Sequence, residues 1–300
     1  MSATASFLEA AVRTATPLLL ASCGEGVSER AGVINIGLEG CIIAGAYAAF
    51  AAGASSPVEG YAAAVAAGAA VGGVFATLSV LLRRDQVIVG TALTMFALGL
   101  TGALFRARPG DAPVFVQTEP AVRIPFLVDV PLVGQALFAQ PLTTYLAFGL
   151  ALGLWWWLRN THAGLALRAV GDAHEAARAA GVRVRVVQGS AALFAASMGG
   201  LAGGTLVLAQ AGSFAEGMSA GRGFLAIAIV ALGRWRIAGI GAASLVFGAA
   251  MALQYVVQSL GWGVRYELVL MVPYLATLAA LGAFGRGDAP AMLGRASARD

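Results

Sequence analysis

Residues Ser28 to Gly40 read SERAGVINIGLEG and run directly into the apolar stretch CIIAGAYAAFAAG. This block places two acids, an arginine and an asparagine at the start of a segment that is apolar enough to enter a membrane. A charged side chain near hydrocarbon costs several kcal/mol unless it is paired or lines a water-filled path. The polar residues of this block are therefore predicted to form a functional site inside a membrane protein.

The composition of the whole chain also indicates a membrane protein. Apolar residues make up 59% of the 300 and charged residues only 11%, whereas a soluble domain carries roughly 25% charged residues. A helix needs about 20 apolar residues to cross a bilayer, so we predict an all-α, polytopic membrane protein with about 8–10 transmembrane helices. The candidate spans, in one domain covering 1–300, are roughly 5–23, 34–53, 60–82, 86–105, 141–158, 188–210, 214–233, 237–259 and 267–284.

Arginines indicate the orientation, because positively charged residues concentrate in cytoplasmic loops. Alternation of the later spans places four arginine-containing stretches on one side, which is predicted to be the cytoplasm. We expect a cytoplasmic loop at about 160–187 and an external loop at about 106–140. Segment 25–33 is either cytoplasmic or re-entrant, so the side of the N-terminus stays open. The four stretches are 83–84, 159–185, 234–236 and 286–299.

A short amphipathic helix is predicted within the cytoplasmic loop. Asp172 is a candidate N-cap, and Glu175 follows it at capping-box spacing. Gly181 is a residue of the type that ends helices. So short a helix is not stable unless it docks on a surface. It is either a lever that couples the membrane domain to a separate ATPase or the cap of an ordinary surface loop.

Several motifs resemble one family, the permease subunits of bacterial ABC importers for nucleosides and simple sugars, within the branched-chain amino acid permease superfamily. The matches follow the family order over nearly the whole chain. The chain departs from the family pattern at two places: Ala173-His174 and Arg236-Ile237 stand where the family usually has Asn-Pro. The matching motifs are SERAGVINIGLEG at 28–40, RDQVIVG at 84–90, the loop pattern at 167–181, AQAGSFAEGMSAGRGFLA at 209–226, GRW at 233–235 and PAMLG at 290–294.

The resemblance implies a permease subunit that forms the translocation path for a nucleoside or a simple sugar in the cytoplasmic (inner) membrane of a bacterium. It implies three protein partners besides membrane lipid: an ABC ATPase, a second and different permease chain, and an extracytoplasmic substrate-binding protein. The chain has no lysine and hence no G-x-x-x-x-G-K-[ST] loop, so ATP is expected on the partner. For this chain we expect no enzyme activity, cofactor, metal or nucleic acid. The residues expected to couple it to the ATPase are Arg168, Gly171, Asp172, Glu175, Ala180 and Gly181.

Polar residues near the ends of the predicted spans are candidates for the substrate pathway. Asn35 and Glu39 are four residues apart and would share one face of a helix that already runs there. The amide of Asn35 can both donate and accept hydrogen bonds, as sugar hydroxyls and nucleobase edges require. The complete set of pathway candidates is Asn35, Glu39, Gln86, Thr91, Thr94, Gln210, Glu216 and Arg222.

Other interpretations of these residues remain open. Glu39 could pair with Arg30 and hold a broken helix, and Thr91 and Thr94 could bond back to their own helix. The competing functional class is a secondary transporter driven by an ion gradient, with Glu39 or Glu216 as its coupling carboxylate. Uptake that depends on ATP rather than on the proton gradient would distinguish the two classes.

Overall fold

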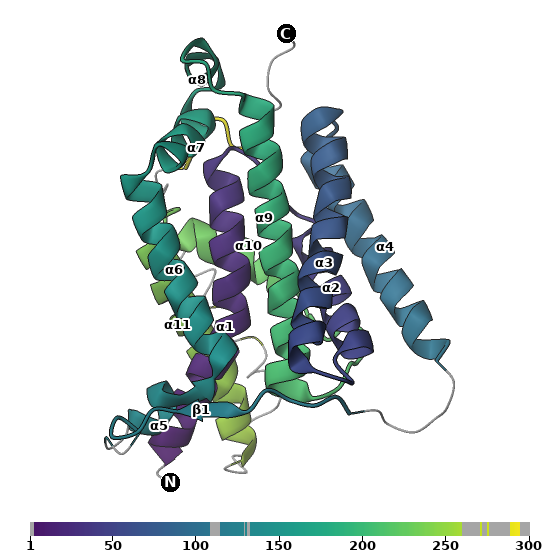
Figure 1. The fold of residues 1–300 in the computed structure, drawn as a ribbon, viewed down its shortest axis with the longest axis vertical. Helices are drawn as coiled ribbons and strands as arrows, with labels where there is room; N and C mark the ends of the chain where they lie inside the picture. The colour runs from purple at the N-terminus through teal and green to yellow at the C-terminus, as the bar shows by residue number, and fades with distance from the viewer. Residues whose placement is uncertain are drawn as a thin grey trace.

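The computed structural model describes residues 3–108, 115–128, 130, 133–259, 271, 275 and 289–294, and most of them lie in long helices packed side by side (Figure 1). The long or apolar helices are α1 (Ala3–Arg30), α2 (Leu38–Ala52), α3 (Pro57–Ala76), α4 (Gln86–Arg106), α6 (Leu142–Asn160), α9 (Val184–Thr205), α10 (Arg222–Leu232) and α11 (Ile237–Ser259). The shorter elements are η1 (Thr77–Leu81), β1 (Ala121–Arg123), α5 (Gly134–Phe138), β2 (Ala139–Pro141), α7 (His162–Asp172), α8 (His174–Ala179) and η2 (Leu206–Ala211).

The prediction of a polytopic helical membrane protein is confirmed. Each of the first eight predicted spans overlaps one of these helices, although α10 covers only 222–232 of the span predicted at 214–233. The ninth, 267–284, lies outside the described residues except at Met271 and Leu275. One local departure from an all-α fold occurs in the predicted external loop, where β1 and β2 pair antiparallel with Ala121 opposite Pro141. The segments that are individually long and apolar enough to cross a membrane are 57–81, 86–106, 184–211 and 237–254.

The arginine-containing stretches that were predicted to be cytoplasmic lie, in their described residues, at one end of the helix bundle. Helices α7 and α8, the upper end of α3 and residues 290–294 lie at one end, and the start of α1 lies at the other (Figure 1). The turn at 234–236 joins the first end, because Arg30 at the end of α1 donates to the carbonyl of Trp235 at 2.8 Å. The positive-inside rule assigns this end to the cytoplasm and therefore places the N-terminus outside.

Helix α1 is longer than the sequence suggested. The predicted span ended near residue 23, but the helix continues to Arg30 and has 28 residues. The two acids in its last turns do not end it, because each carboxylate finds a partner within the protein. Glu25 accepts the backbone amide of Asn35 at 2.7 Å, and Glu29 accepts the indole N–H of Trp235.

Two of the helices, α2 with 15 residues and α10 with 11, are too short to cross a membrane alone. At 1.5 Å per residue they span only about 16–23 Å, against a hydrocarbon core of about 30 Å. Each follows a long helix and an irregular segment: α2 follows α1 and residues 31–37, and α10 follows the α9–η2 helix and residues 212–221. Both are therefore half-helices that begin within the depth of the bundle.

These two units have the same construction in opposite directions. Helix α1 runs from the external end to the cytoplasmic end, whereas α9 starts beside α8 and runs the other way (Figure 1). The C-terminal end of α2 reaches Leu208 of η2, and the C-terminal end of α10 leads to Trp235 beside α1. The half-helices thus point to opposite ends of the bundle, as in the inverted repeats of many transporters.

Glycine allows the central helices α2, α3 and α9 to approach closely. A Cβ atom at Gly200 of α9 would lie 2.2 Å from the carbonyl oxygen of Ala64, and one at Gly45 of α2 would lie 2.3 Å from the carbonyl oxygen of Gly200. Backbone contacts of this kind replace the hydrophobic driving force that membrane helices lack. The abundance of glycine at 199–204 is therefore a packing feature.

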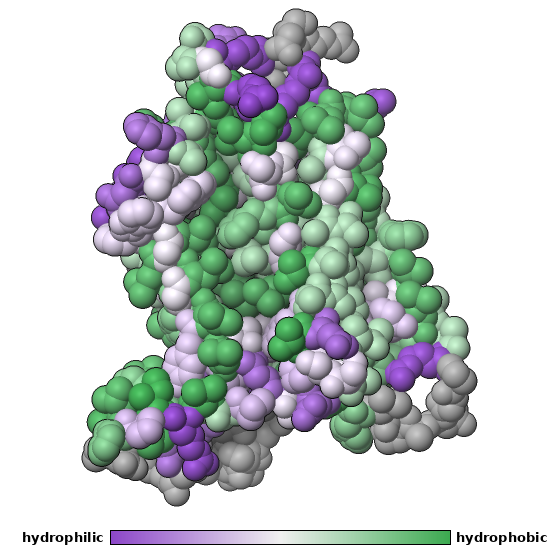
Figure 2. Space-filling view, viewed as in Figure 1, coloured by the Kyte–Doolittle hydropathy of each residue, from purple (hydrophilic) through white to green (hydrophobic). Residues whose placement is uncertain are grey.

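The outer surface matches a protein that sits in a bilayer. Apolar side chains dominate the middle of the face in Figure 2, and hydrophilic side chains gather mainly near its two ends. Exposed apolar residues on α4 illustrate this, since Met95 and Phe96 are 74% and 65% exposed. Such exposure is costly in water and favourable in lipid or against another membrane protein.

Candidate functional site

The N-termini of the two half-helices meet at Glu39. This side chain lies in the first turn of α2 and is 4% exposed. Its two carboxylate oxygens accept the backbone amides of Gly221 at 2.9 Å and Gly223 at 2.7 Å. Those amides belong to the start of α10, where the helix has no internal acceptors for them. The carboxylate therefore caps α10 while sitting at the N-terminal, electropositive end of α2.

Close approach at this junction depends on a glycine. A Cβ atom at Gly223 would lie 2.4 Å from the backbone nitrogen of Glu39 and 2.6 Å from its Cα. Distances below about 3 Å between such atoms require the backbone to move, so no larger residue fits without a shift. The motif AGRGF supplies glycine on both sides of Arg222, which lets the chain start α10 directly against α2.

The segment between α1 and α2 is held by side chains from α1 and α4. The hydroxyl of Ser28 donates to the carbonyl of Val33 at 2.9 Å, and the amide of Ile34 donates to Gln86 Oε1 at 2.9 Å. Glu25 accepts the amide of Asn35, which is fully buried. The Asn35 side-chain amide has no nitrogen or oxygen partner among the described residues. Its donor and acceptor atoms thus lie enclosed at the break in the helix.

The structure divides the predicted pathway residues into two groups. The inner group, which contains Asn35, Glu39, Gln86, Thr94 and Arg222, surrounds the two helix breaks. Within it, Thr94 is buried with its hydroxyl 3.4 Å from the carbonyl of Ile36, and Arg222 donates to the carbonyl of Met218.

The outer group lies near the external end of the bundle. Gln210 donates to the carbonyl of Arg13 at 2.7 Å, and Glu216 forms an exposed ion pair with Arg106 at the end of α4. Thr91 lies apart from both groups, in the second turn of α4, and donates to the carbonyls of Val87 and Ile88, as the backbone-bonding interpretation expected. These residues do not converge on the inner group.

Two details of the sequence-based interpretation need correction. Asn35 and Glu39 do not share a helical face, because α2 begins only at Leu38, after the irregular segment that the buried Asn35 occupies. The partners seen for Glu39 are the α10 amides, so it does hold a broken helix, but through helix capping rather than through the pairing with Arg30 that was considered.

The predicted cytoplasmic helix is present as two helices, α7 and α8. Asp172 is the last residue of α7, and the N-cap of α8 is Ala173, which makes no side-chain capping bond, so the predicted Asp172 cap is wrong. An extended backbone at Ala173 separates the two helices, so that α8 begins one residue after Asp172 has ended α7. Gly181 ends the element as expected, with a left-handed φ of +83°.

The remaining coupling candidates fall on the surface and the base of this element. Glu175 and Ala180 are exposed, Arg168 is half-buried with its guanidinium 3.4 Å from the carbonyl of Gly164, and Gly171 is buried. A Cβ at Gly171 would lie 2.0 Å from the carbonyl oxygen of Arg30, so α7 sits directly on the end of α1. Gly171 therefore allows the end of α7 to pack against the backbone at the end of α1.

The sequence matches one family model, described as the branched-chain amino acid transport system / permease component, over residues 7–281. The chain belongs to this family. The resemblance to permease subunits of ABC importers is thereby confirmed, and the protein is a permease component of a transporter rather than a catalytic subunit.

Named relatives fall into nucleoside and sugar transporters. The guanosine ABC transporter permease protein NupQ of Bacillus subtilis is 35% identical over 92% of this chain and 91% of its own. The putative glucose ABC transporter permease protein TsgC13 of Haloferax volcanii is 37% identical over 87% and 80%. The nucleoside ABC transporter permease protein NupC of Lactococcus lactis is 30% identical over 92% and 91%. The sequence similarity therefore extends over most of this chain, in relatives that are named for different solutes.

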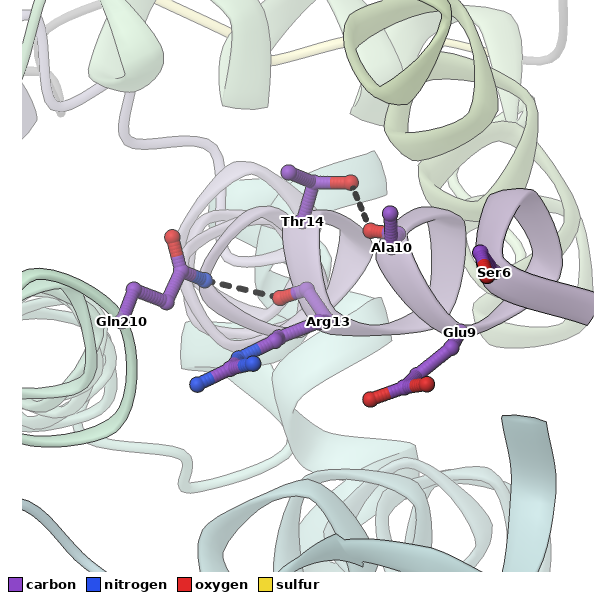
Figure 3. Close-up of a pocket in the computed structure, with 6 residues that line it drawn as sticks. All are labelled: Ser6, Glu9, Ala10, Arg13, Thr14 and Gln210. Carbon is purple, nitrogen blue, oxygen red and sulfur yellow. Dashed lines mark hydrogen bonds between the residues drawn. The ribbon is translucent and has the colours of Figure 1, made fainter. Parts of the chain in front are cut away.

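An external pocket of about 370 Å³ lies beside the start of α1 (Figure 3). Gln210 reaches from the end of the α9–η2 helix to the backbone of Arg13, and the Arg13 guanidinium donates to the carbonyl of Ala209 at 2.9 Å. Glu9 lines the same pocket and is drawn pointing to the same side as Arg13. This pocket brings a predicted residue, Gln210, together with two charged residues that sequence reasoning did not select.

A second, apolar groove of about 770 Å³ lies between α3 and α6. Leu20 and Leu201 are among the residues that line it. At the end of the groove Glu119 accepts the hydroxyl of Tyr61 at 2.8 Å and the amide of Thr143 at 2.9 Å. The polar network ties the external loop to both walls, so the groove has a fixed width at that end.

Proposed function

We propose that this permease contributes one half of the translocation path of an ATP-driven importer for nucleosides. The observation that carries the proposal is the meeting of two half-helices at Glu39, beside the buried and unpaired amide of Asn35. Breaks of this kind mark the substrate sites of many transporters, because irregular backbone within a membrane is tolerated only where it is buried or lines a cavity.

The chemistry of the junction suits an uncharged, polar solute. The positive ends of both half-helices are already balanced by one internal carboxylate, so they do not call for an anionic substrate. The Asn35 amide offers a donor and an acceptor side by side, the pattern that pairs with the edge of a nucleobase. Sugar hydroxyls match it less selectively. Two relatives named for guanosine and nucleosides, each aligned over 91% of its own length, add to the preference for nucleosides.

The partners follow from the two ends of the molecule. The α7–α8 element is the contact for a cytoplasmic ABC ATPase, with Arg168, Gly171, Asp172, Glu175, Ala180 and Gly181 at or under that contact. A second, different permease chain completes the path, and lipid covers the remaining apolar surface. The external end, with Glu216 and Gln210 near it, receives solute from an extracytoplasmic binding protein. The assembly is placed in the cytoplasmic membrane of a bacterium.

Transport by the reconstituted complex tests this proposal. The permease, purified with the partners that accompany it in mild detergent, is placed in liposomes and supplied with labelled guanosine or labelled glucose. We expect ATP-dependent guanosine uptake that vanadate stops and an uncoupler does not. Asn35→Leu is expected to lower uptake at unchanged membrane abundance. Glucose uptake without guanosine uptake would reject the substrate, and uptake that collapses with the proton gradient while ATP is maintained would reject the transporter class.

A further inference from the structure

The break between α1 and α2 is held on its cytoplasmic side by two separate segments, α9 and residues 290–294. Gln188 in the first turns of α9 donates to the carbonyl of Ala31 at 3.2 Å. The amide of Gly294 donates to the carbonyl of Gly32 at 3.1 Å, and the amide of Met292 donates to the carbonyl of Gly171 at 2.9 Å. Residues 31–32 are thus bound to α9 and to the segment 290–294, which is itself bound to α7.

His174, the first residue of α8, joins this cluster through Gln188. The two Nε2 atoms lie 3.2 Å apart, and both side chains are buried, at 5% and 4% exposure. The Ala31 carbonyl can only accept, so it orients the Gln188 NH₂ group rather than the oxygen toward the cluster. The second N–H of that group must then donate to His174, whose Nε2 accepts with the proton on Nδ1.

This bond requires a neutral His174 imidazole, and the surroundings of the side chain favour that form. Burial lowers the pKa of His174 below its ordinary value, and the nearby charge of Arg178 lowers it further. Gly32 leaves the necessary room, because a Cβ there would lie only 3.4 Å from His174 Nε2 and its φ is +86°. His174, Gln188 and the backbone at 31–32 therefore form one compact unit.

The chain that leaves this unit leads directly to the half-helix junction. Ile34 and Asn35 are held by Gln86 and Glu25, and four residues after Asn35 the carboxylate of Glu39 binds the start of α10. A displacement of residues 31–32 is therefore passed along a short, buried and hydrogen-bonded path. On α8, the side chain of His174 is hydrogen-bonded to Gln188 and so joins this helix to the path.

We propose that His174 is a positioning residue for transport, which through Gln188 ties the ATPase-contact helix α8 to the break between α1 and α2, so that movement of α8 reaches the half-helix junction. This inference rests on the proposed function, which makes α8 the ATPase contact. Contiguous packing alone does not demonstrate coupling, so the test measures coupling directly.

The experiment compares His174→Leu, Gln188→Leu and the double variant in the reconstituted complex, with His162→Leu as a matched control, since His162 is exposed on α7. Labelled guanosine uptake and ATP hydrolysis are measured together, so that molecules transported per ATP can be compared. We expect each single variant to lower this ratio about tenfold, as the loss of one buried hydrogen bond implies. Both variants remove the His174–Gln188 bond, and Gln188→Leu also removes the bond to Ala31, so the double variant should be no worse than Gln188→Leu.

A rescue variant separates a coupling role from a structural one. His174→Gln keeps an acceptor for Gln188 and should restore most of the ratio, whereas His174→Leu fills similar space without one. Equal ratios for His174→Leu and the parent protein would overturn the inference, as would independent, additive losses from the two single variants. Ala177→Pro distinguishes the levels of failure. If that variant also transports normally, the ATPase-contact assignment of α8 is wrong. If it is inactive while His174→Leu is normal, only the present inference fails.

Discussion

Glu39 on α2 and Gly223 on α10 form the closest contact between the two half-helices, with a carboxylate oxygen 2.7 Å from the glycine amide. The two residues are 184 positions apart in the sequence. The pair joins the N-terminal and C-terminal halves of the permease at one point in the depth of the bundle. Changes at either residue are therefore expected to affect both halves together.

Replacement of Glu39 by alanine leaves the Gly221 and Gly223 amides buried without their acceptors. Loss of two charge-assisted hydrogen bonds should destabilise the protein by about 2–4 kcal/mol. The Glu39→Gln variant keeps one acceptor oxygen, so its stability should lie between that of the parent protein and that of Glu39→Ala. The check is the thermal unfolding midpoint in detergent, with Glu59→Ala as control, because Glu59 is exposed on α3. A Glu39→Ala midpoint equal to that of the control would contradict the capping role.

Gly223→Ala tests the close approach of α2 and α10. The added Cβ would meet the Glu39 backbone at 2.4 Å, so overpacking should cost about 1–3 kcal/mol and push the half-helices apart. Gly149→Ala on α6 is the matched control, because a Cβ there meets no atom within 4 Å. We expect lower uptake and a lower unfolding midpoint for Gly223→Ala only. Parent-like behaviour of both variants would show that the junction is looser than described.

Ala177→Pro tests the coupling helix. Proline removes the bond from the Ala177 amide to the carbonyl of Ala173 and breaks α8, at a cost of about 3 kcal/mol or more. Because α8 lies outside the membrane-spanning helices, insertion and abundance should be normal while uptake is lost. Ala176→Gly, at an exposed position, should cost only about 1 kcal/mol and have a smaller effect. Arg168→Glu should weaken ATPase binding. Full uptake by both Ala177→Pro and Arg168→Glu, at matched abundance, would refute the assignment.

Glu216→Gln separates the importer from an ion-coupled transporter. The Arg106–Glu216 pair is exposed, with 66% and 42% of the side chains accessible, so its removal should change stability by less than about 1 kcal/mol. Uptake by the variant should still require ATP and resist an uncoupler. Arg106→Gln, which removes the same pair from the other side, should behave alike. Uptake that is driven by protons, and that is lost completely in Glu216→Gln but not in Arg106→Gln, would favour the ion-coupled secondary transporter.

Much of the fold could be predicted because membrane helices carry a strong local signal. The length and apolarity of the segments at 86–105 and 237–259 locate α4 and α11 almost to the residue. The end of α1 could not be located in this way, since Glu25 and Glu29 suggest a loop unless their partners are known. Those partners, Asn35 and Trp235, are supplied by the tertiary structure.

The candidate site was predictable in composition but not in arrangement. The motif around Asn35 and Glu39 identified the break, because polar residues in an apolar context are rarely incidental. That Glu39 binds α10 depends on a contact between residues 184 positions apart, for which one sequence holds no local signal. The role of Gln86 as an acceptor for Ile34 is of the same kind. The end of the coupling element at Gly181 could be predicted from the sequence. The N-cap of α8, which is Ala173 rather than Asp172, could not.

The bonds from Met292 to Gly171 and from Gly294 to Gly32 give the coupling region an order of assembly. Residues 290–294 follow α11 in the chain and so emerge from the ribosome after all of the described membrane helices. The contacts that this segment makes with α7 and with residue 32 are consequently completed only once the helices up to α11 have been synthesised. A nascent chain lacks these two bonds until it has been translated past Gly294.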